Sequence, residues 1–229
     1  MNERRKKALS AAFPVTIPVL TGFLCLGTAY GILMADAGYG PLWTGLMSAI
    51  AFCGSMQFVA VTLLTLAFDP VQAFLLSLMV NARHMFYGLS MMEKYRGLGK
   101  ARVFLISMLC DETFSIVSTV DPPEGADRRD FYLAVTLLNY SYWLAGSLLG
   151  SGVGSLLTFD TTGLDFALTA LFVVLFMEQW KKRENRPSAV IGVVCTAVSL
   201  FLFGAENLVI PAMILILAVL VAGRRKLCT

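Results

Sequence analysis

The chain has 229 residues, of which 57% are hydrophobic and only 14% charged, and its mean hydropathy is +0.73. A soluble domain of this length would need many more polar residues to cover its surface, so the composition excludes an ordinary soluble globular protein. The net charge of +3 does not indicate nucleic-acid binding, because the basic residues gather in short clusters beside apolar runs. These clusters lie at 4–7, 94–102, 181–186 and 224–226.

Eight apolar segments follow one another along the chain, separated by short linkers. A helix needs about 20 apolar residues to cross a bilayer, so we predict an all-α integral membrane protein with about seven to eight membrane segments. The whole chain, 1–229, is predicted to be a single polytopic membrane domain whose halves are joined by the polar linker 121–130. The apolar segments are 14–34, 42–67, 71–92, 103–120, 131–159, 166–180, 189–203 and 208–222.

Motifs of soluble modules and of enzymes are missing from the sequence. No linker is long enough for an ATPase module, and the chain has no GxxxxGK[ST], HExxH, GxGD or GxSxG motif. Five cysteines without CxxC spacing and a single histidine predict neither a disulfide framework nor a metal site. We therefore expect a protein that is not an enzyme and that uses neither a metal nor a cofactor.

The basic clusters also predict how the chain is oriented. Lysine and arginine favour the cytoplasmic side, which places both termini and residues 181–186 there. The linkers around Asp36, Asp160 and Glu206 lack basic residues and are expected outside. Eight full crossings satisfy both termini but put the cluster at 94–102 on the wrong side. The conflict disappears if one segment before this cluster and one after it are re-entrant or broken into half-helices.

Polar residues mark the segments in which such breaks are expected. Non-helical backbone at membrane depth is tolerated only where it is buried in protein or lines a cavity. Four segments have polar or glycine-rich interruptions, and we predict the discontinuous segments among them. The interruptions lie at 53–57 in the second segment, 81–84 in the third, 111–112 in the fourth and 146–154 in the fifth.

The third segment carries Asn81, Arg83 and His84 where purely apolar residues are expected. An arginine at mid-membrane costs roughly 2.5 to 3.5 kcal/mol on insertion scales, so it normally stands beside a counter-charge or a water-filled cavity. We therefore predict a polar site within the membrane that includes Asn81 and Arg83. His84 is either a proton relay or a neutral histidine bonded to a backbone carbonyl, and the sequence leaves both interpretations open.

Asp111 and Glu112 in the fourth segment are the expected counter-charges for Arg83 and His84. Adjacent helix positions point about 100° apart, so one acid can face Arg83 while the other faces a cavity. The residues four positions either side of Glu112 are apolar, which favours a neutral carboxylic acid. We therefore favour Glu112 over Asp111 as a proton carrier. A purely structural clamp between Arg83 and an acid stays an alternative.

Two further groups of residues are candidates for substrate contacts. Gly54, Ser55 and Gln57 can let a helix unwind and present free N–H groups to a carboxylate, although close helix packing explains them equally well. Asn139 begins a stripe at i, i+3, i+4 and i+7 of the fifth segment that includes two aromatic residues and a glycine. This stripe lines a cavity or packs against a neighbouring helix.

Four runs that contain polar interruptions carry a family likeness. They are FCGSMQF at 52–58, NARHMFYG at 81–88, CDETF at 110–114 and GLDFALTALFVVLF at 163–176. In this order they resemble the AzlC family, the large subunit of bacterial and archaeal branched-chain amino-acid exporters. The likeness extends over almost the whole chain.

The resemblance implies a secondary transporter in the cell membrane of a prokaryote. It implies export of leucine, isoleucine, valine and also methionine, driven by the proton gradient, and a small AzlD-type membrane subunit as partner. In such a site Arg83 or a broken-helix terminus would hold the substrate carboxylate, and Asp111 or Glu112 its ammonium group. A channel or transporter for another small solute, and a membrane scaffold without transport activity, stay alternative functions.

Overall fold

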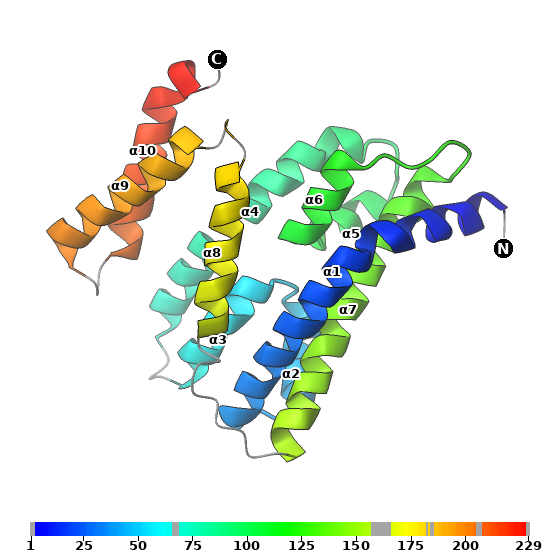
Figure 1. The fold of residues 1–229 in the computed structure, drawn as a ribbon, viewed down its shortest axis with the longest axis horizontal. Coiled ribbons are helices and arrows are strands. Elements are labelled where there is room, and N and C mark those ends of the chain that lie inside the picture. The colour runs from blue at the N-terminus through cyan, green and yellow to red at the C-terminus, as the bar shows by residue number, and fades with distance from the viewer. Residues whose placement is uncertain are drawn as a thin grey trace. The chain divides into compact units, whose positions relative to one another are not determined.

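A computed structural model of the chain describes residues 3–65, 69–156, 166–181, 183, 186–204 and 208–227. The regular elements in these ranges are helices, which confirms the predicted all-α class (Figure 1). They are α1 (Glu3–Asp36), α2 (Pro41–Ile50), α3 (Gly54–Thr65), α4 (Pro70–Lys94), α5 (Ala101–Ser107), α6 (Asp111–Thr119), α7 (Arg128–Leu156), α8 (Phe166–Lys181), α9 (Arg186–Phe203) and α10 (Val209–Leu227).

The helices fall into two compact units, Met1–Ala167 and Leu168–Thr229. Within the described ranges, α1 and α9 are long and apolar enough to cross a membrane, by length and composition alone. The number of membrane segments and the single domain joined at 121–130 stay predictions. The linkers around Asp160 and Glu206 lie outside the described residues.

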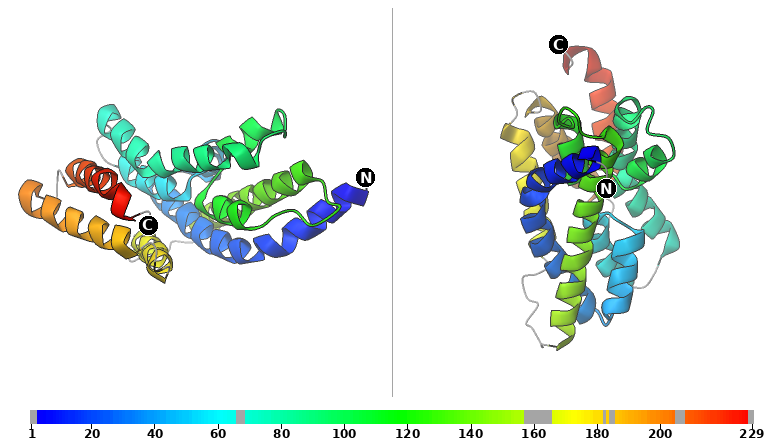
Figure 2. Two further views of the ribbon diagram at one scale, coloured as in Figure 1. Left: turned by 90° about the horizontal axis from the view of Figure 1, so that it is seen from above. Right: turned by 90° about the vertical axis from the view of Figure 1, so that its right-hand side faces the viewer.

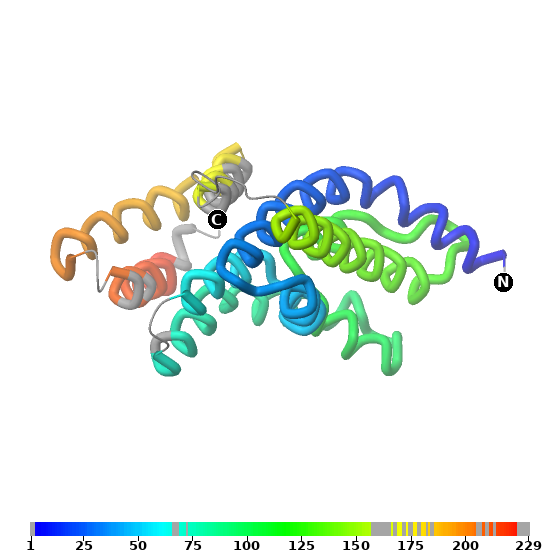
Figure 3. The backbone as a smooth tube through the Cα atoms, turned by 90° about the horizontal axis from the view of Figure 1, so that it is seen from below, coloured from blue at the N-terminus to red at the C-terminus, as the bar shows by residue number. Residues whose placement is uncertain are grey.

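In the first unit, α1 and α7 lie side by side and run in the same direction (Figures 2 and 3). Near their starts, Arg5 Nε lies 3.4 Å from Asp130 Oδ2. Further along, a Cβ atom on Gly146 would lie 2.7 Å from the Phe23 carbonyl oxygen, so the two backbones meet where a side chain has no room. The glycines that contact the partner backbone in this way are Gly27, Gly31, Gly146, Gly150 and Gly154. The interruption at 146–154 is therefore a packing surface, and α7 runs through it unbroken.

The helices α2 and α3 form a hairpin, so that the start of α2 and the end of α3 lie at the same end of the first unit. Helical structure stops at residues 51–53, and α3 then returns until the Tyr39 hydroxyl donates to the Leu64 carbonyl at 3.4 Å. With 10 and 12 residues, these helices are about 15 and 18 Å long, too short to cross about 30 Å of hydrocarbon. The second segment is thus discontinuous, with a break that begins two residues before the predicted stretch at 53–57.

The helices α5 and α6 form a second hairpin in the fourth segment. Gly97 and Gly99 have positive φ angles of 86° and 58°, which allows the tight turn between α4 and α5. Helical structure stops at 108–110, and α6 then returns until Lys94 Nζ donates to the Ser118 carbonyl at 3.4 Å. The fourth segment is therefore discontinuous as well, and α6 begins with the two predicted acids.

The two hairpins open at opposite ends of the first unit. The α2–α3 hairpin opens where α1 ends, because the Tyr39 amide donates to the Met34 carbonyl at 2.8 Å. The α5–α6 hairpin opens where α1 and α7 begin, since Arg128 donates to the Lys94 carbonyl and the Asp127 amide donates to the Arg4 carbonyl. Lys94 consequently lies at the same end as the basic N-terminus. The arrangement is the one expected from the charge conflict, with one folded-back segment on each side of the cluster.

The long helix α4 connects the two hairpins and runs unbroken through the polar stretch 81–84. Of the two candidate segments before the basic cluster, the break therefore lies in the second and not at this stretch of the third. The physical reason is that partners outside α4 bind the polar side chains of Asn81 and Arg83, so the helix does not need to open its own backbone.

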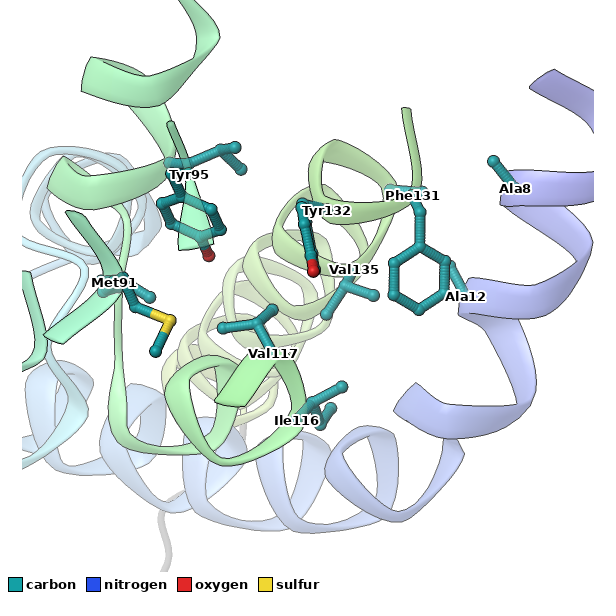
Figure 4. Packing of buried hydrophobic residues seen from close by; sticks show 12 residues of the cluster. Ala8, Ala12, Met91, Tyr95, Ile116, Val117, Phe131, Tyr132 and Val135 are labelled. Atoms are coloured by element: carbon teal, nitrogen blue, oxygen red, sulfur yellow. The ribbon is translucent and has the colours of Figure 1, made fainter. Parts of the chain in front are cut away.

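Apolar side chains hold the α5–α6 hairpin against α1, α4 and α7 at the basic end of the first unit (Figure 4). The rings of Tyr95 and Tyr132 meet edge to face, with centroids 5.3 Å apart. Val117 and Leu105, one from each arm of the hairpin, are fully buried beside them. This core fixes the open end of the hairpin and extends to Leu109 in its tip, where polar contacts are added to the apolar packing.

In the second unit, α9 and α10 pack against each other, and α8 carries an aromatic pair at its end. The ring of Trp180 stacks on Phe176 with centroids 5.8 Å apart, and Arg186 Nε donates to the Trp180 carbonyl at 3.0 Å. A cleft of about 490 Å³ is lined by Phe176 and one face of α9, and its lining is almost wholly apolar. All residues of the charged site predicted from the sequence lie in the first unit.

Candidate functional site

The tips of the two hairpins meet α4 near the middle of its 25 residues. Arg83 is the residue that joins them, because its Nη2 atom donates to Ser55 Oγ at 2.7 Å and lies 2.9 Å from Asp111 Oδ2. Ser55 stands in the first turn of α3, and Asp111 is the first residue of α6. The predicted pairing of Arg83 with an acid of the fourth segment is thus confirmed for Asp111.

The ion pair between Arg83 and Asp111 is partly shielded from solvent. The side chains of Arg83 and Asp111 are 29% and 21% exposed, so the ion pair is mostly removed from solvent without being sealed. The N-termini of α3 and α6 both lie beside Arg83, and helix N-termini carry partial positive charge that stabilises carboxylates. Together with Glu112, the site holds two carboxylates, one guanidinium and two helix N-termini. It can bind one anionic and one cationic group.

Tyr87 completes the surroundings of Asp111 and was missed by the sequence reasoning. Its hydroxyl donates to Asp111 Oδ1 at 2.8 Å, and its ring stacks on Phe114. The signal that could have found it is its spacing, because Tyr87 lies four residues after Arg83 and so occupies the same face of α4.

The tip of the α2–α3 hairpin is anchored on α7 through neutral hydrogen bonds. Gln57 is fully buried, and its Oε1 accepts a hydrogen bond from Trp143 Nε1 at 2.7 Å. Its Nε2 donates to the carbonyl of Ala51 at 2.8 Å, within the break itself. A Cβ atom on Gly54 would lie 2.9 Å from the Trp143 ring, so glycine is needed for this close approach. In this structure Gln57 and Gly54 hold the tip on α7.

The tip of the α5–α6 hairpin is anchored one helical turn earlier on α7. Asn139 Nδ2 donates to Thr113 Oγ1 at 3.0 Å, and Cys110 Sγ lies 3.1 Å from the same hydroxyl. Asn139 is fully buried, so this contact is shielded from solvent. Asn139 is therefore linked to the first turn of α6, and so to the predicted site, through Thr113.

The remaining predicted residues lie around the same tips. Cys53 Sγ donates to Asn81 Oδ1 at 2.9 Å, which ties the first break to α4. The His84 ring lies edge-on to the Tyr87 ring at 5.6 Å. Glu112 is half-buried at the position next to Asp111. The structure thus gathers acids, arginine, histidine and the broken-helix residues in one place, and their roles in function stay predictions.

Comparison with known proteins gives the family of the chain. Residues 18–157 match the family model described as AzlC protein. The chain is 49% identical over 229 residues to the "Branched-chain amino acid transport protein AzlC" of Bacillus subtilis, an alignment that covers 99% of this chain and 90% of the relative. No solved structure matches the chain.

More distant relatives are named as membrane proteins. An "Uncharacterized membrane protein" of Helicobacter pylori strain 26695 is 41% identical over 221 residues, covering 96% of this chain and 97% of the relative. The "Inner membrane protein YgaZ" of Escherichia coli K12 is 25% identical over 178 residues, covering 74% of this chain and 72% of the relative. The resemblance read from the four sequence runs is therefore confirmed, and the chain belongs to the AzlC family, whose members include a transport protein.

Proposed function

We propose that this chain is a secondary transporter that exports branched-chain amino acids from the cytoplasm, with methionine as a further substrate. The observation that carries the proposal is the meeting of two half-helix N-termini at Arg83 and Asp111, halfway along α4. Broken helices that present their termini to a charged substrate are a common design of secondary transporters. The name of the Bacillus subtilis relative supports the substrate class.

The proposed topology follows from the hairpins and the basic clusters. In it α1, α4 and α7 cross the bilayer, and the two hairpins dip into it from opposite sides. The end that carries Arg4, Arg5 and Lys94 faces the cytoplasm of a prokaryotic cell, because basic residues favour that side. This topology puts Arg83 near the bilayer midplane, the depth at which transporters of broken-helix type bind substrate.

The charged groups match the two ends of a zwitterionic amino acid. Arg83 and the first turn of α3, which includes Ser55, bind the substrate carboxylate. Asp111 and Glu112 attract the ammonium group. A carboxylate that binds Arg83 competes with Asp111 for the guanidinium, so substrate arrival weakens the link between the two hairpin tips.

Proton coupling is assigned to Glu112. Both oxygens of Asp111 already have partners, since Arg83 and Tyr87 bind one each, whereas Glu112 is the adjacent acid outside these two bonds. A half-buried carboxyl group beside a second acid is suited to binding and releasing a proton. Inward proton flow through Glu112 would then drive release of the substrate outside. The small partner subunit of AzlD type is proposed from the family resemblance.

The test uses purified protein in proteoliposomes, reconstituted alone and together with an AzlD-type subunit. Counterflow of labelled leucine at equal pH reports substrate binding and exchange, while uptake driven by an imposed pH gradient reports coupling. We expect Glu112→Gln to lose gradient-driven transport but to keep a reduced counterflow, because Asp111 still attracts the ammonium group. The matched control is Glu124→Gln, which removes an exposed acid of the linker and should change neither activity.

Two outcomes would contradict the proposal. If Glu112→Gln keeps gradient-driven transport with an unchanged pH dependence, the proton is carried by another group. If the wild-type protein shows no counterflow of leucine, isoleucine or valine in either reconstitution, the substrate class is wrong.

A further inference from the structure

Tyr87 touches α6 at two points that lie one helical turn apart. Its hydroxyl donates to Asp111 Oδ1 at 2.8 Å, and its ring stacks on Phe114 with centroids 4.2 Å apart and an angle of 11° between the planes. Phe114 follows Asp111 by three residues, so both contacts fall on the same face of α6. Tyr87 therefore fixes the height and the rotation of the first turn of α6 relative to α4.

The second partner of Asp111 is also on α4. Arg83 Nη2 lies 2.9 Å from Asp111 Oδ2, and Arg83 and Tyr87 are one turn apart on the same face of their helix. The carboxylate of Asp111 is thus held between a cation and a hydroxyl donor, with one oxygen for each. These are charge-assisted bonds, so together they hold the Asp111 side chain in one place against α4.

Building on the proposed transport function, we propose that Tyr87 is a positioning residue that keeps Asp111 seated on Arg83, which leaves Glu112 as the acid that exchanges the transported proton. The two adjacent acids then have separate tasks. Asp111 keeps the hairpin tip on α4 in every protonation state of Glu112. Without the Tyr87 hydroxyl, Asp111 Oδ1 loses its donor and the carboxylate is held by Arg83 alone.

In the part of the chain that the structure describes, the titratable groups near Asp111 lie on α4 and at the start of α6. From α4 these are Arg83, His84 and Tyr87, and from the start of α6 they are Cys110 and Glu112. Replacing Tyr87 by phenylalanine removes only the hydroxyl and retains the ring that stacks on Phe114. The substitution therefore changes the hydrogen bonding of Asp111 and leaves the other charged groups in place.

The first measurement is leucine counterflow at equal pH on both sides of the membrane, from pH 5 to 8. We expect the acid limit of activity in Tyr87→Phe to move upward by about one pH unit, because a hydrogen bond to a charged group is lost. The control Phe114→Leu keeps the hydroxyl and loses the ring stacking. It should lower activity at all pH values without moving the acid limit.

The second measurement does not depend on any substrate. The thermal unfolding midpoint of detergent-solubilised protein is followed over the same pH range for the wild type, Tyr87→Phe and Asp111→Asn. The acid loss of stability should begin at higher pH in Tyr87→Phe, and the Tyr87→Phe substitution should cause no such shift when added to Asp111→Asn. Coincident acid limits for the wild type and Tyr87→Phe in both measurements would overturn the role of Tyr87. Absence of leucine counterflow in the wild type, with the shift in unfolding intact, would instead overturn the transport proposal alone.

Discussion

The two hairpins share a plan and differ in charge. In each, the second half-helix begins directly after a cysteine, Cys53 in one and Cys110 in the other. Both tips hydrogen-bond to α7 at positions four residues apart, through Trp143 and Asn139, and both reach Arg83 on α4. The α2–α3 tip offers only neutral groups to these partners, whereas the α5–α6 tip brings two carboxylates.

Because of this difference, one hairpin tip only has to be held in position, whereas the other also has to balance the charge of Arg83. The neutral tip is positioned by amide and hydroxyl bonds, which resist changes of pH and salt. The charged tip depends on Arg83, and Arg83 in turn needs Asp111, because neither is stable alone in a mostly buried place. We therefore expect changes at the α2–α3 tip to lower stability first and changes at the α5–α6 tip to alter transport first.

The largest effect is expected from Arg83→Ala, which removes the one side chain that joins both tips. It leaves Asp111 without its cation, at a cost of about 3 kcal/mol, a value at the lower end for buried pairs because this pair is partly exposed. The measurement is the unfolding midpoint in detergent, together with leucine counterflow. The double variant Arg83→Ala with Asp111→Ala should be more stable than Arg83→Ala alone, and a lower midpoint for the double variant would refute the charge argument.

The next largest effect is expected from Trp143→Phe, which removes the indole donor of the neutral tip. Gln57 Oε1 is then left buried without its partner, which costs about 1 to 3 kcal/mol. The unfolding midpoint should fall while the pH dependence of counterflow stays unchanged. Trp180→Phe in the second unit is the matched control, since Trp180 is 41% exposed. A shifted pH dependence in Trp143→Phe would show that the two tips are not separable.

The sequence predicted the site better than it predicted the breaks, and the reason is physical. Charge compensation is a strong constraint within apolar segments, so Arg83 could be matched with the two acids of the fourth segment, and the structure shows that Asp111 is the one that binds it. The polar stretches of the second and third segments look alike, yet only one lies at a break. What decides is whether a partner helix satisfies the polar side chains, as happens for Asn81 on α4.

Contacts between residues far apart in the chain could not be predicted from the sequence either, because they depend on how the helices pack. The bond between Gln57 and Trp143 joins residues 86 positions apart, and neither periodicity nor spacing signals it. The glycines of the fifth segment were equally ambiguous, because a glycine serves a helix break and a close helix contact alike. Only the position of α1 against α7 shows that Gly146 serves the contact.

A smaller effect is expected from Thr113→Val, which removes the anchor of the charged tip on α7. Asn139 Nδ2 loses its acceptor, at a cost of about 1 kcal/mol. Although this destabilisation is smaller than that of Trp143→Phe, the loss of leucine transport should be greater, because Thr113 is two residues from Asp111. Thr119→Val at the far end of α6 is the control, since its hydroxyl bonds only within its own helix. Equal transport losses for Thr113→Val and Trp143→Phe would remove the functional difference between the tips.

The smallest effect is expected at the open ends of the hairpins. The α5–α6 end is closed by an ion pair in which Lys94 Nζ lies 2.8 Å from Asp121 Oδ1, whereas the α2–α3 end has the neutral bond from Tyr39 to Leu64. The hydrogen bond and the charge of Lys94 lower the pKa of Asp121. A carboxyl group with a lowered pKa stabilises the fold above its unfolded-state pKa, and this contribution disappears as the pH falls through the folded-state value.

Asp121→Asn should therefore lower the unfolding midpoint slightly at pH 7. It should have no effect at a pH below the pKa of the Asp121 carboxyl group in the folded protein. Since the Asp121 side chain is 80% exposed, salt at about 1 M should also abolish the difference. The comparison variant Tyr39→Phe breaks the neutral end, and its effect should depend on neither pH nor salt. If both variants respond to salt alike, the two hairpins do not differ in how their open ends are held, and the distinction between a neutral and a charged hairpin applies only to their tips.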